Sequence, residues 1–251
     1  MTRRFLFTVD LDRDVNIQLE GRPEAGSIDR GQGTAPRFAS AERGLHLLLD
    51  LLDDIGMKAT FFVEGRTAQT IDCSVLSGHC IGFHGYDHED MAKLDDPLRA
   101  MSEGYRAVKD NVSAPVCFRA PYMSADDRTF DALRELNIKH DSSVYSDPGT
   151  APYDISGITE HPVAKGRDRA GRTIAAYLWP LHEGKRIPSD YVELALSSGD
   201  NDFILATHTW HLVERRDSGP MSEEDVRRNL SDVREALTGI IDSGYRPSGM
   251  V

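Results

Sequence analysis

Cysteine is scarce in this chain of 251 residues. Its three cysteines, Cys73, Cys80 and Cys117, have the spacing of neither a disulfide framework nor a zinc–thiolate site, so we expect them to be small buried side chains. No segment approaches the roughly 18 uninterrupted apolar residues of a membrane helix, and the first residues lack the apolar core of a signal peptide. We therefore expect a soluble, cytoplasmic protein without a membrane span.

Clusters of basic residues are missing as well. The net charge is −12, and Lys and Arg do not gather in a run, which argues against nucleic acid as a partner. Hydrophobic residues make up 39% of the chain and charged residues 28%, the ordinary balance of a soluble globular protein. The sequence also contains no serine or cysteine nucleophile elbow, so we expect no covalent intermediate.

Short apolar runs alternate with amphipathic stretches along the chain. Strands are predicted at residues 5–10, 58–65, 79–85, 116–121, 138–145, 172–180 and 203–210, and helices at 41–55, 97–112, 125–136, 189–196 and 222–241. About seven β–α repeats favour a mostly parallel sheet that closes, or nearly closes, into a barrel. Residues 14–37 and 146–172 are predicted as long loops. No linker divides the chain, which predicts a single catalytic domain over residues 1–251.

Two acidic residues end the first predicted strand. Residues two apart on a strand point the same way, so Asp10 and Asp12 lie on the face opposite Phe7 and Val9. This face points into the barrel, at the strand end where barrel enzymes carry their catalytic groups. Inward-facing carboxylates are costly without a partner, so we expect a cation nearby, unless the pair only forms a solvated strand end. Asp14 continues the same period and is a competing ligand candidate.

The stretch GFHGYDH (82–88) carries two histidines four residues apart. Alternation along the strand points His84 inward, and His88 reaches the same place if the chain makes one turn. Two imidazoles and one carboxylate are a frequent catalytic Zn²⁺ set that leaves a position open for water. The spacing alone is weak evidence, because Gly85 stands where a zincin motif has glutamate, and two polar residues in a flexible loop explain it too.

Three further strand ends carry polar side chains. Arg119, in FRAPY, points into the barrel and needs a carboxylate, for which Asp10 is the candidate unless the arginine forms a surface salt bridge. Asp141 ends the next strand, and His208 ends the strand FILATHTW. A histidine that donates one ring nitrogen to a carboxylate and offers the other to substrate is a general acid, so Asp141 and His208 are predicted to pair. His211 is a second candidate for the acid.

The order of these motifs resembles the polysaccharide deacetylase superfamily, which is the NodB homology domain of carbohydrate esterase family four. The resemblance covers roughly residues 5–245 and is most specific in KATFF and GHCIGFHGYDH, whereas FRAPY, DSSVY and THTW are looser matches. It implies a distorted or incomplete TIM-like (β/α)7 barrel. It also implies a divalent metal, zinc before others, and hydrolysis of an N-acetyl or other amide group.

The resemblance assigns roles by position. It implies that Asp12, His84 and His88 bind the metal, that Asp10 is the general base and that His208 is the general acid. Arg119 would orient the base, Asp141 would tune the acid, and Pro121, Tyr122 and Leu205 would contact the substrate.

Two departures from the family pattern bear on the substrate. Leu11 separates two aspartates that are usually adjacent, and Ala206 stands where the family usually has leucine, with Leu205 one position earlier. The DxD form with a long following loop resembles a subgroup that includes intracellular, often oligomeric deacetylases and allantoinase-like hydrolases, which leaves room for a homo-oligomer. We expect a metal-dependent N-deacetylase of an N-acetylated carbohydrate. A hydrolase of small cyclic amides or ureides is the alternative, and a catalytically dead binding barrel is the third.

Overall fold

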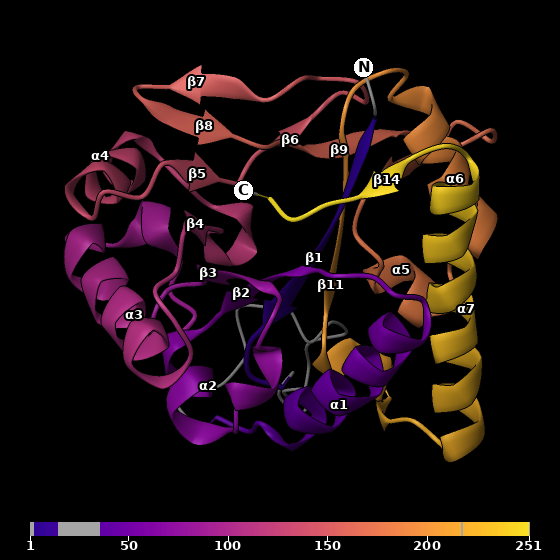
Figure 1. Cartoon of the computed structure of the whole chain (residues 1–251), viewed down its shortest axis with the longest axis horizontal. Helices are drawn as coiled ribbons and strands as arrows, with labels where there is room; N and C mark the ends of the chain where they lie inside the picture. The colour runs from indigo at the N-terminus through magenta and orange to yellow at the C-terminus, as the bar shows by residue number, and fades with distance from the viewer. Residues whose placement is uncertain (1–2, 15–35, 217, 251) are drawn as a thin grey trace.

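A curved sheet forms the centre of the molecule (Figure 1). The computed structural model describes residues 3–14, 36–216 and 218–250. The sheet contains, in spatial order, β11 (Phe203–His208), β1 (Arg4–Leu11), β2 (Thr60–Val63), β3 (Cys80–Phe83), β4 (Cys117–Phe118), β5 (His140–Asp141), β8 (Ile158–Glu160) and β7 (Tyr153–Ile155), with β14 (Arg246–Pro247) beside β1. Neighbouring strands run parallel from β11 to β8, and only β7 is antiparallel to its neighbour. The parallel order places the C-terminal strand ends together at one edge.

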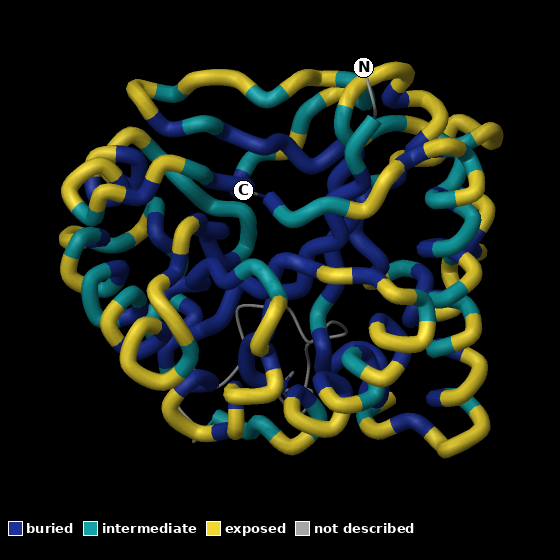
Figure 2. Tube along the Cα trace, in the orientation of Figure 1, coloured by how far each residue is buried: buried dark blue, intermediate teal, exposed yellow. Residues whose placement is uncertain are grey.

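Helices cover the outer side of this sheet (Figure 1). They are α1 (Ala39–Asp54), α2 (Gly65–Thr70), α3 (Pro97–Asn111), α4 (Asp127–Glu135), α5 (Trp179–His182), α6 (Pro188–Ser197) and α7 (Glu223–Asp242). Helix α1 shows why they pack there, because its Leu45, Leu48 and Leu52 recur at helical spacing and are all fully buried. Figure 2 shows the result, with buried strands inside and exposed helix faces outside. No helix among the described residues is both long and apolar enough to span a membrane.

A second, small sheet lies next to β11 and extends the barrel. It consists of β6 (Tyr145–Ser146), β9 (Val163–Arg167) and β10 (Thr173–Ala175). The N–H of Ala206 on β11 donates to the carbonyl of Ala176 at 2.9 Å, and the N–H of Leu178 donates to the carbonyl of Ala206 at 2.8 Å. The N–H of Ala176 also donates to the carbonyl of Ala164 on β9 at 2.7 Å. A separate sheet therefore takes the place of the last strands of the barrel, which confirms the predicted fold, a distorted or incomplete barrel.

Two predicted segments differ in the structure. Residues 146–172, predicted as a loop, contain β7, β8 and β9. The β7–β8 hairpin turns at Ser156 and Gly157, which have φ of 53° and 87°. Its strands have only three residues each, which is too short for an alternation of apolar and polar residues to be recognised in the sequence. Residues 172–180 were predicted as one strand, but the strand ends at Ala175 and helix α5 begins at Trp179. Pro180 has no N–H to donate to a neighbouring strand, so the strand cannot continue through it. The predicted loop 14–37 lies almost wholly outside the described residues.

A close backbone approach fixes the segment that follows β11. This segment begins with the helical turn η5 (Trp210–Leu212), which contacts α1. A Cβ added at Gly44 of α1 would come within 1.9 Å of the carbonyl oxygen of Thr209. Only glycine permits this approach, so α1 holds the backbone directly after His208 in place.

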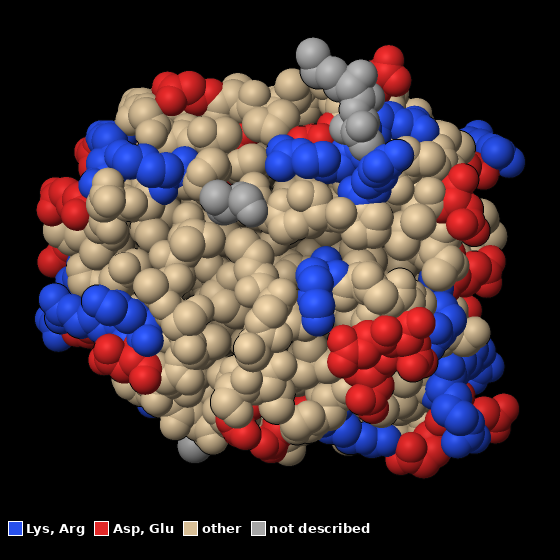
Figure 3. All heavy atoms as spheres, viewed as in Figure 1, with Lys and Arg blue, Asp and Glu red and all other residues tan. Residues whose placement is uncertain are grey.

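Charged side chains of both signs are interspersed over the face of the molecule in Figure 3. Most of them lie toward the periphery of this view, and its centre is largely uncharged. On this face, the excess of acidic residues in the sequence forms no single continuous patch.

Candidate active site

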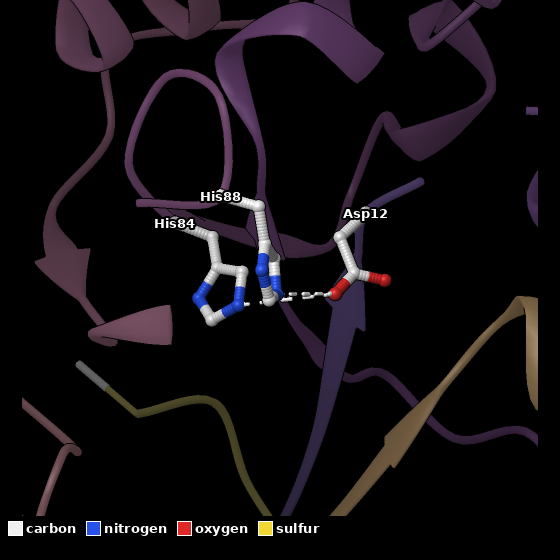
Figure 4. A group of neighbouring side chains, drawn as sticks. All are labelled: Asp12, His84 and His88. Atoms are coloured by element: carbon white, nitrogen blue, oxygen red, sulfur yellow. Dashed lines mark ion pairs between the residues drawn. The ribbon is translucent and has the colours of Figure 1, made fainter. Parts of the chain in front are cut away.

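Asp12, His84 and His88 converge at the C-terminal ends of β1 and β3 (Figure 4). Oδ2 of Asp12 lies 3.1 Å from Nε2 of His88 and 3.9 Å from Nε2 of His84. One ligand atom from each residue lies within 4.8 Å of the others, and all three side chains are buried. The structure thus brings together the three residues that the sequence nominated as metal ligands.

The hydrogen bond of Nδ1 determines the tautomer and the orientation of the His84 ring. Nδ1 of His84 is 2.8 Å from the carbonyl oxygen of Arg119. A carbonyl oxygen only accepts, so Nδ1 carries the hydrogen and Nε2 offers its lone pair toward Asp12. A carboxylate and two imidazoles facing one point are a donor set that fits a divalent cation such as zinc.

The turn between the two histidines has an unusual backbone. Gly85 has φ of 71°, and His88, which is not a glycine, has φ of 57°. The turn is held in place because the N–H of Gly65 donates to the carbonyl of Gly85 at 3.0 Å. A left-handed conformation at a histidine is sparsely populated, so the surrounding structure has to hold it. Here it returns His88 to the side of His84.

Asp10 lies beside the metal-ligand group and is held by Arg119. Nη1 of Arg119 donates to Oδ1 of Asp10 at 3.0 Å, and the hydroxyl of Tyr177 donates to Oδ2. Burial raises the pKa of Asp10, but Arg119 and, after it, the neighbouring histidines and the Tyr177 hydroxyl together lower this pKa below its ordinary value. Asp10 is therefore an ionised carboxylate at neutral pH. The predicted contact between Arg119 and Asp10 is confirmed.

Arg119 is itself fixed by neutral partners. It is fully buried, donates through Nε to the carbonyl of Ser142 at 2.9 Å, and lies 4.4 Å from the centre of the Phe62 ring. Nη1 also donates to the hydroxyl of Thr8 at 2.9 Å. These contacts leave the guanidinium little freedom, so it holds Asp10 in one orientation.

The two histidines nominated for the acid face different partners. Nε2 of His208 lies 3.9 Å from Oδ2 of Asp12 and 3.2 Å from the Tyr177 hydroxyl. Nε2 of His211 instead lies 2.8 Å from Oε1 of Glu183. His208 is therefore the histidine next to the ligand group, and its side chain remains 18% exposed toward the open side of the site.

The predicted pairing of Asp141 with His208 is wrong. The carboxylate of Asp141 accepts from the N–H and hydroxyl of Ser143 at 3.1 and 2.8 Å, and it faces Glu160 across the β5–β8 pair. Burial, followed by the negative charge of Asp141, raises the pKa of Glu160 well above its usual range, so the two carboxyl groups share a proton. The sequence missed Glu160 because it lay in a predicted loop.

Asp14 is not a metal ligand in the structure. Its two carboxylate oxygens accept from the backbone N–H groups of Ser40 and Ala41 at 3.0 and 2.7 Å. These groups belong to the first turn of α1, where N–H groups have no partner within the helix. Asp14 therefore caps α1.

A cavity of about 190 Å³ opens above these residues. Its wall contains Asp10, His84, His88, His208, His211 and Arg216 together with the aromatic residues Tyr122, Tyr145, Tyr177, Trp179 and Trp210, and with Ala120 and Met123. Tyr122, predicted to contact substrate, is part of this wall. The next residue along, Met123, shares its left-handed backbone, with φ of 55° against 62° for Tyr122.

Two other predicted substrate contacts are not part of this wall. Leu205 is fully buried in the core, because side chains alternate along β11 and the inward positions belong to Ala206 and His208. Pro121 is buried near Gly85. Sequence reasoning missed Tyr177, Tyr145, Trp179 and Trp210. The aromatic run YLWP (177–180) was a signal for two of them, but a strand interpretation of 172–180 hid it.

Residues 38–140 match the family of polysaccharide deacetylases. A peptidoglycan deacetylase-like protein of Gibberella zeae is 30% identical over 45% of this chain and 36% of its own length. A chitin deacetylase of Colletotrichum lindemuthianum is 32% identical over 32% of this chain and 37% of its own length. The chain thus spans little more than a third of each of these curated relatives.

Solved structures share the fold over the whole chain. A polysaccharide deacetylase structure from Mycobacterium smegmatis superposes with a TM-score of 0.61 at 21% identity, covering 100% of this chain and 94% of that one. A carbohydrate esterase family four pseudoenzyme from Bacillus anthracis superposes with a TM-score of 0.57 at 12% identity, covering 99% and 64%. The same fold therefore occurs in a protein described as an enzyme family member and in one described as inactive.

Proposed function

We propose that the chain is a polysaccharide deacetylase relative that hydrolyses an amide C–N bond, removing the acetyl group from an N-acetylated carbohydrate; the match of residues 38–140 to that family and the similarity to a chitin deacetylase support this proposal. One observation carries the proposal. A single cavity is lined by the two histidines of an Asp–His–His donor set, by the ionised carboxylate of Asp10 and by His208, which lies 3.9 Å from Asp12 of that set. These are the parts that water-based hydrolysis of an amide requires.

Each residue has a distinct task in this proposal. Asp12, His84 and His88 would hold a divalent cation, with zinc the first candidate, and such an ion supplies Lewis acidity that acidifies water and polarises a carbonyl group. Asp10, kept ionised by Arg119, accepts a proton from the attacking water. His208 donates a proton to the amine nitrogen, because an amine departs poorly as an anion.

The fold alone does not support activity, since a pseudoenzyme shares it. The proposal therefore depends on the side chains, and this chain has candidates for both proton-transfer roles as well as for three ligands. The relatives named above do not support the cyclic-amide alternative, and we do not propose it. Flat aromatic faces from Tyr122, Trp179 and other rings in the cavity wall suit the C–H face of a sugar ring.

The proposal is tested by acetate release. The purified chain, stripped of metal and then loaded with zinc, is incubated with free N-acetyl sugars and with chitin oligomers. Acetate should appear only with the metal. It should fall about 10²- to 10⁴-fold in Asp10→Asn, which loses the base and keeps the ligands. Asp110→Asn, an exposed acidic residue of α3, is the matched control and should remain active. A zinc-loaded protein that releases acetate from none of these sugars contradicts the proposal.

A further inference from the structure

Tyr177 lies between the two residues that would move protons. Its hydroxyl contacts Oδ2 of Asp10 and lies 3.2 Å from Nε2 of His208. Its ring centre is 5.0 Å from that of His208, with the planes inclined by 36°. Only 5% of Tyr177 is exposed, so water does not readily replace these contacts. One phenol thus touches both ends of the proton-transfer machinery.

The backbone gives Tyr177 a fixed distance from both partners. The residues on either side of it, Ala176 and Leu178, are hydrogen-bonded to Ala206, two positions before His208 on β11. Its own carbonyl accepts from the hydroxyl of Tyr191 at 3.1 Å. Asp10 and His208 are direct neighbours in the β1–β11 register. Tyr177 therefore contacts two residues, Asp10 and His208, that are themselves paired between β1 and β11.

The direction of the two hydrogen bonds follows from donor capacity. A phenol has one hydrogen to donate, and burial raises the pKa of Tyr177 well above its ordinary value, so the hydrogen is retained. This hydrogen points to Asp10, because the hydroxyl of Tyr177 donates to Oδ2 of Asp10 while Oδ1 accepts from Arg119. The oxygen of Tyr177 is then left to accept at His208, which requires a hydrogen on Nε2.

We propose that Tyr177 is a positioning residue that aligns Asp10 with His208 and keeps a hydrogen on Nε2 of His208. The hydrogen is then on the nitrogen that lies 3.9 Å from Oδ2 of Asp12, whereas the other tautomer carries it on Nδ1. The kinetic part of this inference rests on the proposed function. The hydrogen-bond part does not, and it can be measured in a protein of any activity.

The tautomer is tested directly by long-range ¹H–¹⁵N spectra of the zinc-loaded full chain, with His208 assigned from a His208→Gln sample. The hydrogen of His208 should reside on Nε2, and Tyr177→Phe should remove this preference. A wild-type His208 with its hydrogen on Nδ1 overturns the proposal without any variant. A Tyr177→Phe protein with an unchanged His208 spectrum overturns it as well.

Kinetics separate alignment from general stability. Tyr177→Phe should lower kcat about 10²-fold, while KM and zinc content stay close to wild type. Tyr245→Phe is the matched control, because its hydroxyl donates to the carbonyl of Ala195 at 2.7 Å, a buried bond to backbone from a residue outside the cavity wall. It should keep kcat. Wild-type kcat in Tyr177→Phe, or loss of zinc together with kcat, contradicts the proposal. If the wild type releases no acetate, the proposed function fails and the spectra still decide the role of Tyr177.

Discussion

Two groups of histidines surround the end of β11, and their ring nitrogens have different partners. In the cavity, His84 and His88 direct Nε2 toward the carboxylate of Asp12. Behind the strand, His182 has both ring nitrogens occupied by neutral groups, with the amide oxygen of Asn229 at 2.8 Å and the hydroxyl of Thr207 at 2.7 Å. The first group can bind a cation, whereas His182 has no lone pair free for one.

The charged groups around these histidines also differ. Burial lowers the pKa of His182 to about 3, because the charged form of the ring is desolvated, and the neighbouring His211 lowers this pKa further. In the cavity, the buried carboxylates of Asp10 and Asp12 make positive charge favourable. Histidines that are close in space thus serve different purposes, and their partners rather than their residue type decide which.

The largest effect is expected from His88→Ala. It removes one proposed ligand without touching the core, so the fold should remain while bound zinc and hydrolysis are lost. We expect at least about a 10³-fold fall in activity, equivalent to ~4 kcal/mol of transition-state stabilisation. Metal analysis, acetate release and circular dichroism check this result. Zinc at full occupancy in the variant would remove His88 from the ligand set.

The converse change, His182→Gln, should affect stability and leave zinc in place. Losing one of two buried hydrogen bonds should cost about 1–3 kcal/mol of unfolding free energy. Urea unfolding and metal analysis, run in parallel with His88→Ala, give the comparison. If His182→Gln loses zinc as His88→Ala does, the two histidine groups are not independent.

The same histidine predicts an acid sensitivity. Above pH 6.5 the ring is neutral in both states; below it, the unfolded chain binds a proton that the folded protein refuses until about pH 3. Unfolding free energy should therefore fall as pH decreases through this window, by up to ~1.4 kcal/mol per pH unit from this group. Urea titrations at several pH values should show a smaller slope in His182→Gln. The exposed His46→Gln is the control and should keep the wild-type slope.

At pH 5, the smallest effect is expected from Glu160→Gln. Glu160 retains its proton in the folded protein, and glutamine also donates, so the change at pH 5 should be within about 1 kcal/mol. At higher pH the unfolded wild type releases this proton and the folded protein does not, so wild-type stability is lost as pH rises above ~4.5. The variant lacks this loss and should gain relative to wild type at pH 8. An equal difference at both pH values would show that Glu160 is ionised in the fold.

The sequence predicted the parts of the site that depend on strand alternation. Asp10, Asp12, His84 and Arg119 each follow a strand whose phase determines the inward face, and the structure brings these residues together. Asp141 failed because its strand, β5, has only two residues, and its partner Glu160 comes from a strand hidden in a predicted loop. Tyr177 was missed because its segment changes from strand to helix at Pro180.

Other predictions remain open. The extent of the catalytic domain, the homo-oligomer, the cytoplasmic location and the choice of zinc stay predictions. Strand phase says nothing about them. The convergence of Asp12, His84 and His88, in contrast, supports the proposal that these three residues bind one zinc ion.

X-ray absorption at the zinc edge tests that statement most directly. The account predicts stoichiometric zinc in the loaded chain, with imidazole nitrogens and a carboxylate oxygen at about 2.0–2.2 Å, and loss of one imidazole shell contribution in His88→Ala. Zinc that binds without imidazole nitrogens, or a chain that binds no zinc at all, would contradict it.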